Sequence, residues 1–216
     1  QAARDSIVAD FGVEVTIYSL DLSLGANVEQ LVNDCGDVDI LVNNAGTIPG
    51  GTIEEINEER WRTAWELKVF GYINMMRECY RMMKSRGRGV IVNVIGNAGN
   101  QAPAEYAAGV SADAMLEVLT RTLGGDSLDH GIRVVGVSPG DLLNERGIMF
   151  LRRQAEEELG DPERWSERLA ELPGGRAGAS EEVADAIVFL ASPRSNYTSG
   201  AILTIDGGVS ARRAVM

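Results

Sequence analysis

The chain has 216 residues, 44% of them hydrophobic and 24% charged, which suits one globular domain with a sizeable core. Its formal net charge of −12 argues against nucleic acid and anionic membranes as partners. No apolar run approaches the roughly 20 residues of a membrane-spanning helix. The two cysteines lack metal-site spacing and suit reduced thiols, and the single histidine argues against a histidine metal centre or a Ser-His-Asp triad. We therefore expect a cytoplasmic protein with no metal site.

Helix and strand patterns alternate along the chain. Gly12 closes a predicted helix end, and Ser180 caps a predicted helix near the C-terminus. The patterns predict helices over 1–11, 26–34, 53–86, 105–123 and 180–191, and strands over 13–22, 38–42, 90–95, 132–137 and 202–205. Because the strands are apolar on both faces, they predict an α/β protein with a Rossmann-like, doubly wound parallel sheet.

We expect residues 1–216 to form a single domain, because no linker or internal repeat interrupts the pattern. Residues 141–178 are too long for a simple connection and are predicted to form a lid over the ligand site. Residues 89–113 read as strand, loop and helix, with the loop at the carboxyl end of the strand. In open parallel sheets ligands bind at that end, so this stretch is expected to shape the site.

Four motifs occur in an order that resembles the short-chain dehydrogenase/reductase family. Asp21 follows a predicted strand, and Asn43-Asn44-Ala45-Gly46 resembles the family's NNAG motif. Pro139-Gly140 resembles its PG motif, and Tyr197-Thr198-Ser199-Gly200 leading to Asp206-Gly207-Gly208 resembles its C-terminal strand and turn. The resemblance implies an NAD or NADP cofactor, a small-molecule hydroxyl or carbonyl substrate, and a homodimer or homotetramer. It implies cofactor contacts from Asp21, Leu22, Asn43, Ala45, Gly46, Pro139, Gly140 and Asn144.

The sequence departs from the family at its beginning. The family opens with a strand, a Gly-rich TGxxxGxG turn and a helix, which cradle the cofactor pyrophosphate. This chain has no such motif, and residue 1 falls in what resembles the second helix of the fold. We expect that an N-terminal strand-helix-strand unit is missing from this sequence. The alternative is a protein that lacks half of the cofactor site.

The family's catalytic Asn, Ser, Tyr and Lys do not match either. Alignment with the family at the helix end 119–123 and the strand end 92–94 puts Gly96 at the position of the family's catalytic serine. Gly109 then stands at the tyrosine position and Asp113 at the lysine position. From Trp61 and Gly71, the asparagine position falls on Lys68.

Tyr106, Gly109 and Asp113 are spaced to share one helical face, and Tyr106 lies about one turn, or roughly 5 Å, from the usual tyrosine position. One hypothesis makes Tyr106 the proton donor or acceptor, with Lys68 in the electrostatic role of the lost lysine. The other makes Tyr106 a packing residue. Both include a buried ion pair between Lys68 and Asp113.

Two functions follow from these residues. The first is an NAD(P)-dependent oxidoreductase with the non-standard catalytic residues Tyr106, Lys68 and Asp113. The second is a catalytically inactive nucleotide-binding or scaffold protein on the same fold. Lyase or isomerase chemistry is a third possibility on such a fold.

Overall fold

The computed structural model describes residues 1–212, except for the side chains of residues 100 and 101. Within this part of the chain, four strands form one parallel sheet in the order β1-β2-β3-β4. The strands are β1 (Ile40–Asn43), β2 (Gly89–Val94), β3 (Ile132–Pro139) and β4 (Ile202–Ile205). This sheet confirms the predicted α/β class.

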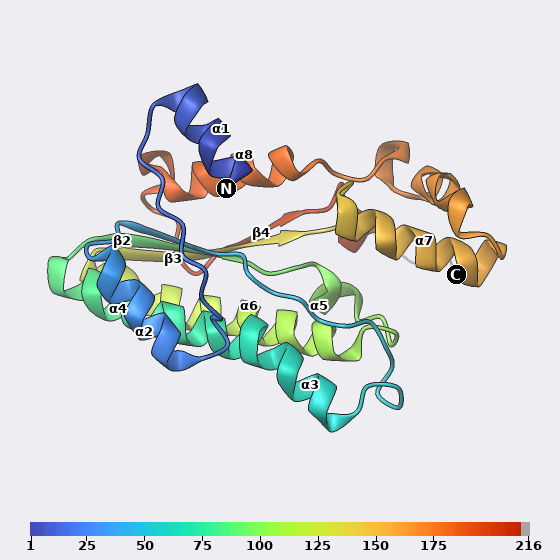
Figure 1. The fold of residues 1–216 in the computed structure, drawn as a ribbon, viewed down its shortest axis with the longest axis horizontal. Helices are drawn as coiled ribbons and strands as arrows, with labels where there is room; N and C mark the ends of the chain where they lie inside the picture. The colour runs from blue at the N-terminus through green and yellow to red at the C-terminus, as the bar shows by residue number, and fades with distance from the viewer. Residues whose placement is uncertain (213–216) are drawn as a thin grey trace.

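Helices cover both faces of the sheet, as Figure 1 shows. One face carries α2 (Gly25–Cys35), α4 (Tyr72–Arg86) and α6 (Ala107–Ser127). Above the other face lie α1 (Ala2–Phe11) and α8 (Ser180–Ala191). The sheet is therefore doubly wound, as the sequence predicts. No helix within residues 1–212 is both long enough and apolar enough to cross a bilayer.

Alternation along the strands divides the core into two layers. Ile91 faces α4 and α6, whereas Val92 faces α8, and both side chains are fully buried. On β3, Ile132 and Val134 belong to the first layer and Val135 to the second. Successive strand residues point to opposite faces, so an unbroken apolar run is what a sheet covered on both sides requires.

The helix predicted over 53–86 begins at Glu58, because the Asn57 side chain accepts a hydrogen bond from the backbone N–H of Arg60. It comprises α3 (Glu58–Trp65), a π-helical segment η1 (Glu66–Gly71) and α4. Such π segments are rare and occur frequently at functional sites. Here the segment contains Lys68.

The strand predicted over 13–22 is wrong for the described chain. These residues form no strand there, and Asp21 and Leu22 lie at a turn. A β-strand needs a neighbour for its backbone hydrogen bonds, and β1 is the edge of the described sheet. Ile40 and Val42 of β1 remain 49% and 42% exposed. The preceding strand-helix-strand unit stays a prediction.

Helix α6 passes through Gly124-Gly125, where the sequence predicts its end, and continues to Ser127. At Gly124 a Cβ atom would lie 2.2 Å from the backbone nitrogen of Gly200. The glycine therefore allows close contact between α6 and the loop before β4 rather than ending the helix.

Residues 141–178 leave the sheet after β3 and return just before α8. They contain α7 (Glu145–Leu159) and the 3₁₀ segments η3 (Pro162–Glu171) and η4 (Pro173–Gly175). The remaining short helix, α5 (Ala98–Gln101), lies outside this excursion and precedes α6. The ends of this excursion are joined, because Gly178 N–H donates to Asp141 O at 2.9 Å and Leu143 N–H donates to Gly178 O at 2.8 Å. Its role as a substrate lid stays a prediction.

Short 3₁₀ turns complete the described structure. They are η2 (Leu128–His130), η5 (Pro193–Ser195) and η6 (Val209–Ala211). The turn at η5 follows α8, and Arg133 of β3 donates hydrogen bonds to the last carbonyls of that helix, those of Leu190, Ala191 and Ser192. This buried guanidinium satisfies helix-end acceptors that would otherwise lack partners.

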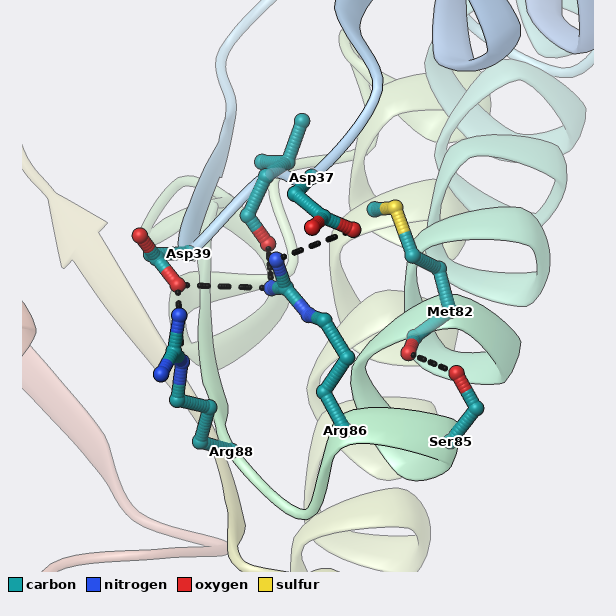
Figure 2. A network of polar contacts seen from close by, with 7 residues as sticks. Asp37, Asp39, Met82, Ser85, Arg86 and Arg88 are labelled. Atoms are coloured by element: carbon teal, nitrogen blue, oxygen red, sulfur yellow. Dashed lines mark hydrogen bonds and ion pairs between the residues drawn. The ribbon is translucent and has the colours of Figure 1, made fainter.

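An arginine holds the end of α4 against the start of β1, as Figure 2 shows. The Arg86 guanidinium donates to the backbone carbonyl of Val38 and forms ion pairs with Asp37 at 3.3 Å and Asp39 at 3.4 Å. Its side chain is only 15% exposed, whereas Arg88, which also pairs with Asp39, is 71% exposed.

These two arginines form a matched pair for a stability test. Arg86→Met should lower the free energy of unfolding by roughly 1–3 kcal/mol, because a buried charge-assisted hydrogen bond is lost. Arg88→Met should change it by less than about 0.5 kcal/mol, because exposed pairs contribute little. Urea denaturation of both variants measures the difference, and equal effects would contradict this account of the contact.

Candidate functional site

The carboxyl ends of β1 and β2 are joined by a buried polar network. Asn43 Nδ2 donates to Asn93 Oδ1 at 2.9 Å, and Asn93 Nδ2 donates to Thr120 Oγ1 of α6 at 2.9 Å. All three side chains are buried. Asn43 thus fixes the geometry of the loop that follows β1, and its side-chain amide is committed to the protein.

Lys68 extends from the π-helical segment to the end of β2. Its ammonium donates to the carbonyl oxygens of Val94 at 2.8 Å and Ile95 at 3.0 Å, and to the Tyr72 hydroxyl at 3.3 Å. Burial lowers the pKa of Lys68 to about 8, and the Asp113 carboxylate opposes that shift. These contacts use all three N–H donors of the ammonium, so Lys68 has no further N–H group to donate to a ligand.

The predicted ion pair between Lys68 and Asp113 is absent from the structure, which describes both residues. Lys68 turns to the strand-end carbonyls instead. Asp113 is 5% exposed and faces Gly96, where a Cβ atom would lie 2.6 Å from its Oδ2. Burial raises the pKa of Asp113 to about 6, partly offset by the charge of Lys68. A carboxyl group with this pKa can exchange protons near neutral pH.

The raised pKa of Asp113 predicts a pH-dependent stability difference. The folded protein favours the protonated carboxyl, so the stabilisation is complete below the unfolded pKa of 3.8 and is lost as pH rises through about 6. Asp113→Asn should therefore match the parent near about pH 4 and exceed it by up to about 3 kcal/mol near about pH 7. Denaturation across this pH range measures the difference. Asp126→Asn controls for the removal of one charge, and a pH-independent difference for Asp113→Asn would refute the assignment.

Tyr106 occupies the space that a side chain at position 109 would need. A Cβ atom built on Gly109 would lie 1.9 Å from Cε1 and 2.1 Å from Cζ of the Tyr106 ring. The tyrosine is the N-cap residue of α6, and its ring lies back over the first turn of that helix. Burial raises the pKa of the Tyr106 hydroxyl, whereas the charge of Arg146 lowers it.

Arg146 is a site residue that the sequence reasoning missed. Its guanidinium donates to the Tyr106 hydroxyl and to the Gly46 carbonyl, both at 3.3 Å. It also lies 5.6 Å from the centre of the Phe150 ring, which meets the Tyr106 ring edge-on at 6.2 Å. Helix α7 therefore covers the hydroxyl of Tyr106. No motif in the sequence indicates this contact, because it joins residues 40 and 100 positions apart.

Tyr72 was also missed, although its spacing from Lys68 was a usable signal. The two residues are four apart on one continuous helix and so lie on the same side. The Tyr72 hydroxyl donates to the Val94 carbonyl at 2.8 Å, and burial raises the pKa of Tyr72 above its ordinary value.

Four of the residues expected to contact cofactor lie at or just after the ends of β1 and β3. Ala45 is exposed, and Gly46 is so close to Lys68 that a Cβ atom would meet Lys68 Cδ at 2.6 Å. Pro139 ends β3, and a Cβ atom on Gly140 would lie 2.7 Å from Asp206 Cβ. Both glycines are thus required by close packing.

Asn144 is the N-cap of α7. Its Oδ1 accepts a hydrogen bond from Gly147 N–H at 2.9 Å, which leaves its amide N–H groups without an acceptor among the described residues. Asp21 accepts hydrogen bonds from the N–H and hydroxyl of Ser23, and the Leu22 carbonyl lies against Gly71 at the end of the π segment. Cofactor contacts from these three residues stay predictions.

A cavity of about 380 Å³ lies beside Gly140, between the end of the 141–178 excursion, the start of α8 and the end of β4. Asp141, Arg176 and Asp206 are among its lining residues, and none of the predicted site residues lines it. The cavity lies at the carboxyl ends of β3 and β4, whereas Lys68 and Asp113 lie at the carboxyl end of β2, where their perturbed pKa values mark them as candidates for proton transfer.

Comparison with known proteins assigns nearly the whole chain to the family that its sequence motifs resemble. Residues 2–210 match the sequence family described as Enoyl-(Acyl carrier protein) reductase. A solved structure titled "short chain dehydrogenase/reductase family protein" is 32% identical, covers 98% of this chain and 83% of that chain, and superposes with a TM-score of 0.82. The chain belongs to the short-chain dehydrogenase/reductase family. Its class is therefore oxidoreductase of the short-chain dehydrogenase/reductase type.

Two further relatives illustrate the range of this family. An "Uncharacterized oxidoreductase" of Thermotoga maritima is 37% identical over 209 residues, which are 95% of this chain and 81% of the relative. The L-sorbose reductase of Gluconobacter frateurii, solved with NADPH and L-sorbose, is 30% identical, covers 95% of this chain and 81% of that chain, and has a TM-score of 0.87. Members of the short-chain dehydrogenase/reductase family with similar folds thus differ in substrate, which their individual sites decide.

Proposed function

We propose that this protein transfers a hydride between NAD or NADP and a small hydroxyl or carbonyl substrate, with Tyr106 as the proton donor or acceptor. The observation that carries the proposal is the position of the Tyr106 ring, which fills the space left by Gly109 at the family's tyrosine position. Proton transfer needs near-contact geometry. In this proposal, the direction of the Tyr106 ring makes up for the one helical turn that separates residue 106 from the family's tyrosine position.

The described residues fit the nicotinamide end of the cofactor by their chemistry. The uncommitted amide N–H groups of Asn144 can donate to the cofactor carboxamide, and Ala45 and Gly46 present backbone at the same edge of the sheet. Asn43 supports this loop through Asn93. When bound, the cofactor supplies or accepts the hydride. Cofactor contacts from Asp21, Leu22, Pro139 and Gly140 belong to the same proposal.

Tyr106 protonates the carbonyl oxygen during reduction and removes the hydroxyl proton during oxidation. Arg146 donates a hydrogen bond to the Tyr106 oxygen, which favours the phenolate form that remains after proton transfer. Lys68 adds a fixed positive charge from the end of β2. The Tyr106 phenolate regains its proton from water, and the Asp113 carboxyl, whose pKa burial raises to about 6, is a second group that can exchange protons near neutral pH. Together these groups take over the work of the family's Tyr and Lys.

The second candidate function is a nucleotide-binding or scaffold protein without catalysis. Glycine at the serine and tyrosine positions and Asp113 at the lysine position favour it directly. Calorimetric titration with NADH and NADPH, followed by turnover assays with a panel of aldehydes and ketones, separates the two functions. Cofactor binding with turnover supports the oxidoreductase, whereas binding without turnover across the panel supports the second candidate.

The expected homodimer or homotetramer stays a prediction. We propose that α6 and β4 take part in the contact, because Val118 of α6 and Leu203 of β4 are apolar side chains that are 61% and 40% exposed. Light scattering of the purified protein measures the assembly, and a monomer at every concentration would contradict it. The proposed compartment is the cytoplasm.

A further inference from the structure

Arg146 differs from most other arginines of this protein in having no acidic partner. In the part of the chain that the structure describes, twelve arginines form ion pairs with Asp or Glu, namely Arg4, Arg62, Arg77, Arg81, Arg86, Arg88, Arg121, Arg152, Arg153, Arg164, Arg168 and Arg176. Within residues 1–212, no carboxylate pairs with Arg146, whose two hydrogen bonds go to neutral oxygens at 3.3 Å. Two engaged N–H groups leave three of its five donors available.

The neighbouring charges leave the Arg146 cation uncompensated. Lys68 and Asp113 carry opposite charges when ionised and offset one another, so the site keeps the positive charge of Arg146. Arg153 provides the contrast on the same helix, because it pairs with Glu157 at 2.8 Å. A guanidinium with free donors beside a reactive hydroxyl is a receptor for a carboxylate or phosphate group.

The position of Arg146 also limits the size of its ligand. Its Nη2 lies 3.3 Å from the Tyr106 oxygen, and a substrate carbonyl oxygen accepting from that hydroxyl lies at about 2.7 Å. A carboxylate held by the guanidinium at about 2.8 Å is then next to the reacting carbonyl. Only a short spacer of one or two carbon–carbon bonds joins groups this close, as in 2-oxo and 3-oxo acids.

We propose that Arg146 binds the carboxylate of a short 2-oxo or 3-oxo acid, or of the matching hydroxy acid, whose oxygen contacts Tyr106. This inference rests on the proposed oxidoreductase function. In reduction, a hydride from the reduced nicotinamide forms the new C–H bond, and the carbonyl π electrons take the proton of Tyr106. The products are the hydroxy acid, the oxidised cofactor and the Tyr106 phenolate, which regains a proton from water. A neutral ketose, in contrast, leaves the Arg146 donors without a charged partner.

A matched substrate pair tests the inference in the full chain. 3-Oxobutanoate and its methyl ester carry the same ketone, but only the first has a carboxylate. Arg146→Met should lower the ratio of kcat/KM for the acid to that for the ester by about 10- to 100-fold. Any effect exerted through Tyr106 lowers both values and cancels from the ratio. Arg146→Lys should restore part of the preference, and Arg152→Met, which loses an exposed ion pair on the same helix, should leave the ratio unchanged.

Calorimetry separates the remaining outcomes. The affinities for NADH and NADPH should be unaltered in Arg146→Met. If they fall while the acid-to-ester ratio stays constant, the anion at Arg146 is a cofactor phosphate and the inference is overturned. If neither ketone is turned over, the oxidoreductase proposal fails, but binding of 3-oxobutanoate that is lost in Arg146→Met still supports the anion site. Absence of such binding in the parent protein overturns it.

Discussion

Tyr106→Phe should reduce NAD(P)H-dependent carbonyl turnover by about 10²- to 10⁴-fold, with little change in stability. The substitution removes only the hydroxyl, whose described contact is the 3.3 Å hydrogen bond from Arg146. The phenyl ring keeps its place over Gly109 and its edge-on contact with Phe150. Because the ring packing is retained, a loss of kcat reports on proton transfer rather than on folding.

Steady-state kinetics of the purified variant measure this effect against a second tyrosine. Tyr197 is 96% exposed, and Tyr197→Phe should leave kcat unchanged. The affinity for NADH or NADPH should be equal in the parent and both variants. Turnover by Tyr106→Phe within about threefold of the parent would falsify the role of this residue as the acid, since one lost proton donor costs far more.

Among substitutions that add a single methyl group to α6, Gly124→Ala should destabilise the protein most. The new Cβ atom would lie 2.2 Å from Gly200 N, 2.4 Å from Gly200 Cα and 2.7 Å from the Val134 carbonyl oxygen. The same Gly200 N–H donates to that carbonyl at 2.8 Å, so relief of the clash disturbs a buried backbone hydrogen bond beside β3. Backbone atoms cannot rotate away as side chains do, and we expect a loss of at least about 3 kcal/mol.

The adjacent glycine provides the control. A Cβ atom on Gly125 meets nothing within 4 Å, and Gly125 is exposed on the same helix. Alanine is the better helix former, so Gly125→Ala should stabilise the protein by about 0.5–1 kcal/mol. Thermal denaturation of the two variants should therefore give shifts of opposite sign. Two small shifts in the same direction would show that α6 does not pack against the loop as described.

Most helices and strands could be predicted from the sequence because each buries an apolar stripe or face. The helix over 180–191 and the strand over 202–205 have the bounds that the pattern predicts, but Ala179 is the N-cap of the helix and Ser180, the predicted cap, is its first helical residue. The strand over 13–22 was misread for a physical reason. Its β-branched residues have strand propensity, but pairing depends on a neighbour, and β1 edges the described sheet. Local sequence cannot reveal whether that neighbour is present.

The site was predictable only in part. Register along β2 and α6 identified Asp113, and Trp61 and Gly71 identified Lys68. The structure confirms that both residues are buried, but contacts of Lys68 with the strand-end carbonyls replace the expected ion pair between them. Register placed Tyr106 about one turn from the family's tyrosine position, and it could not show that the ring lies over Gly109, because sequence spacing does not fix side-chain direction. The contacts of Arg146 could not be predicted from the sequence, because they depend on how α7 packs over the loop at Gly46.

Direct observation of hydride transfer tests the central claim that this chain is an active oxidoreductase of its family. Reduced cofactor labelled with deuterium at the nicotinamide C4 position is incubated with the protein and a carbonyl substrate, and the alcohol product is analysed by mass spectrometry and NMR. The account predicts deuterium on the carbinol carbon, with the label transferred by the parent and Tyr197→Phe but only marginally by Tyr106→Phe. Unlabelled product, or labelling that is equally fast in Tyr106→Phe, would contradict it.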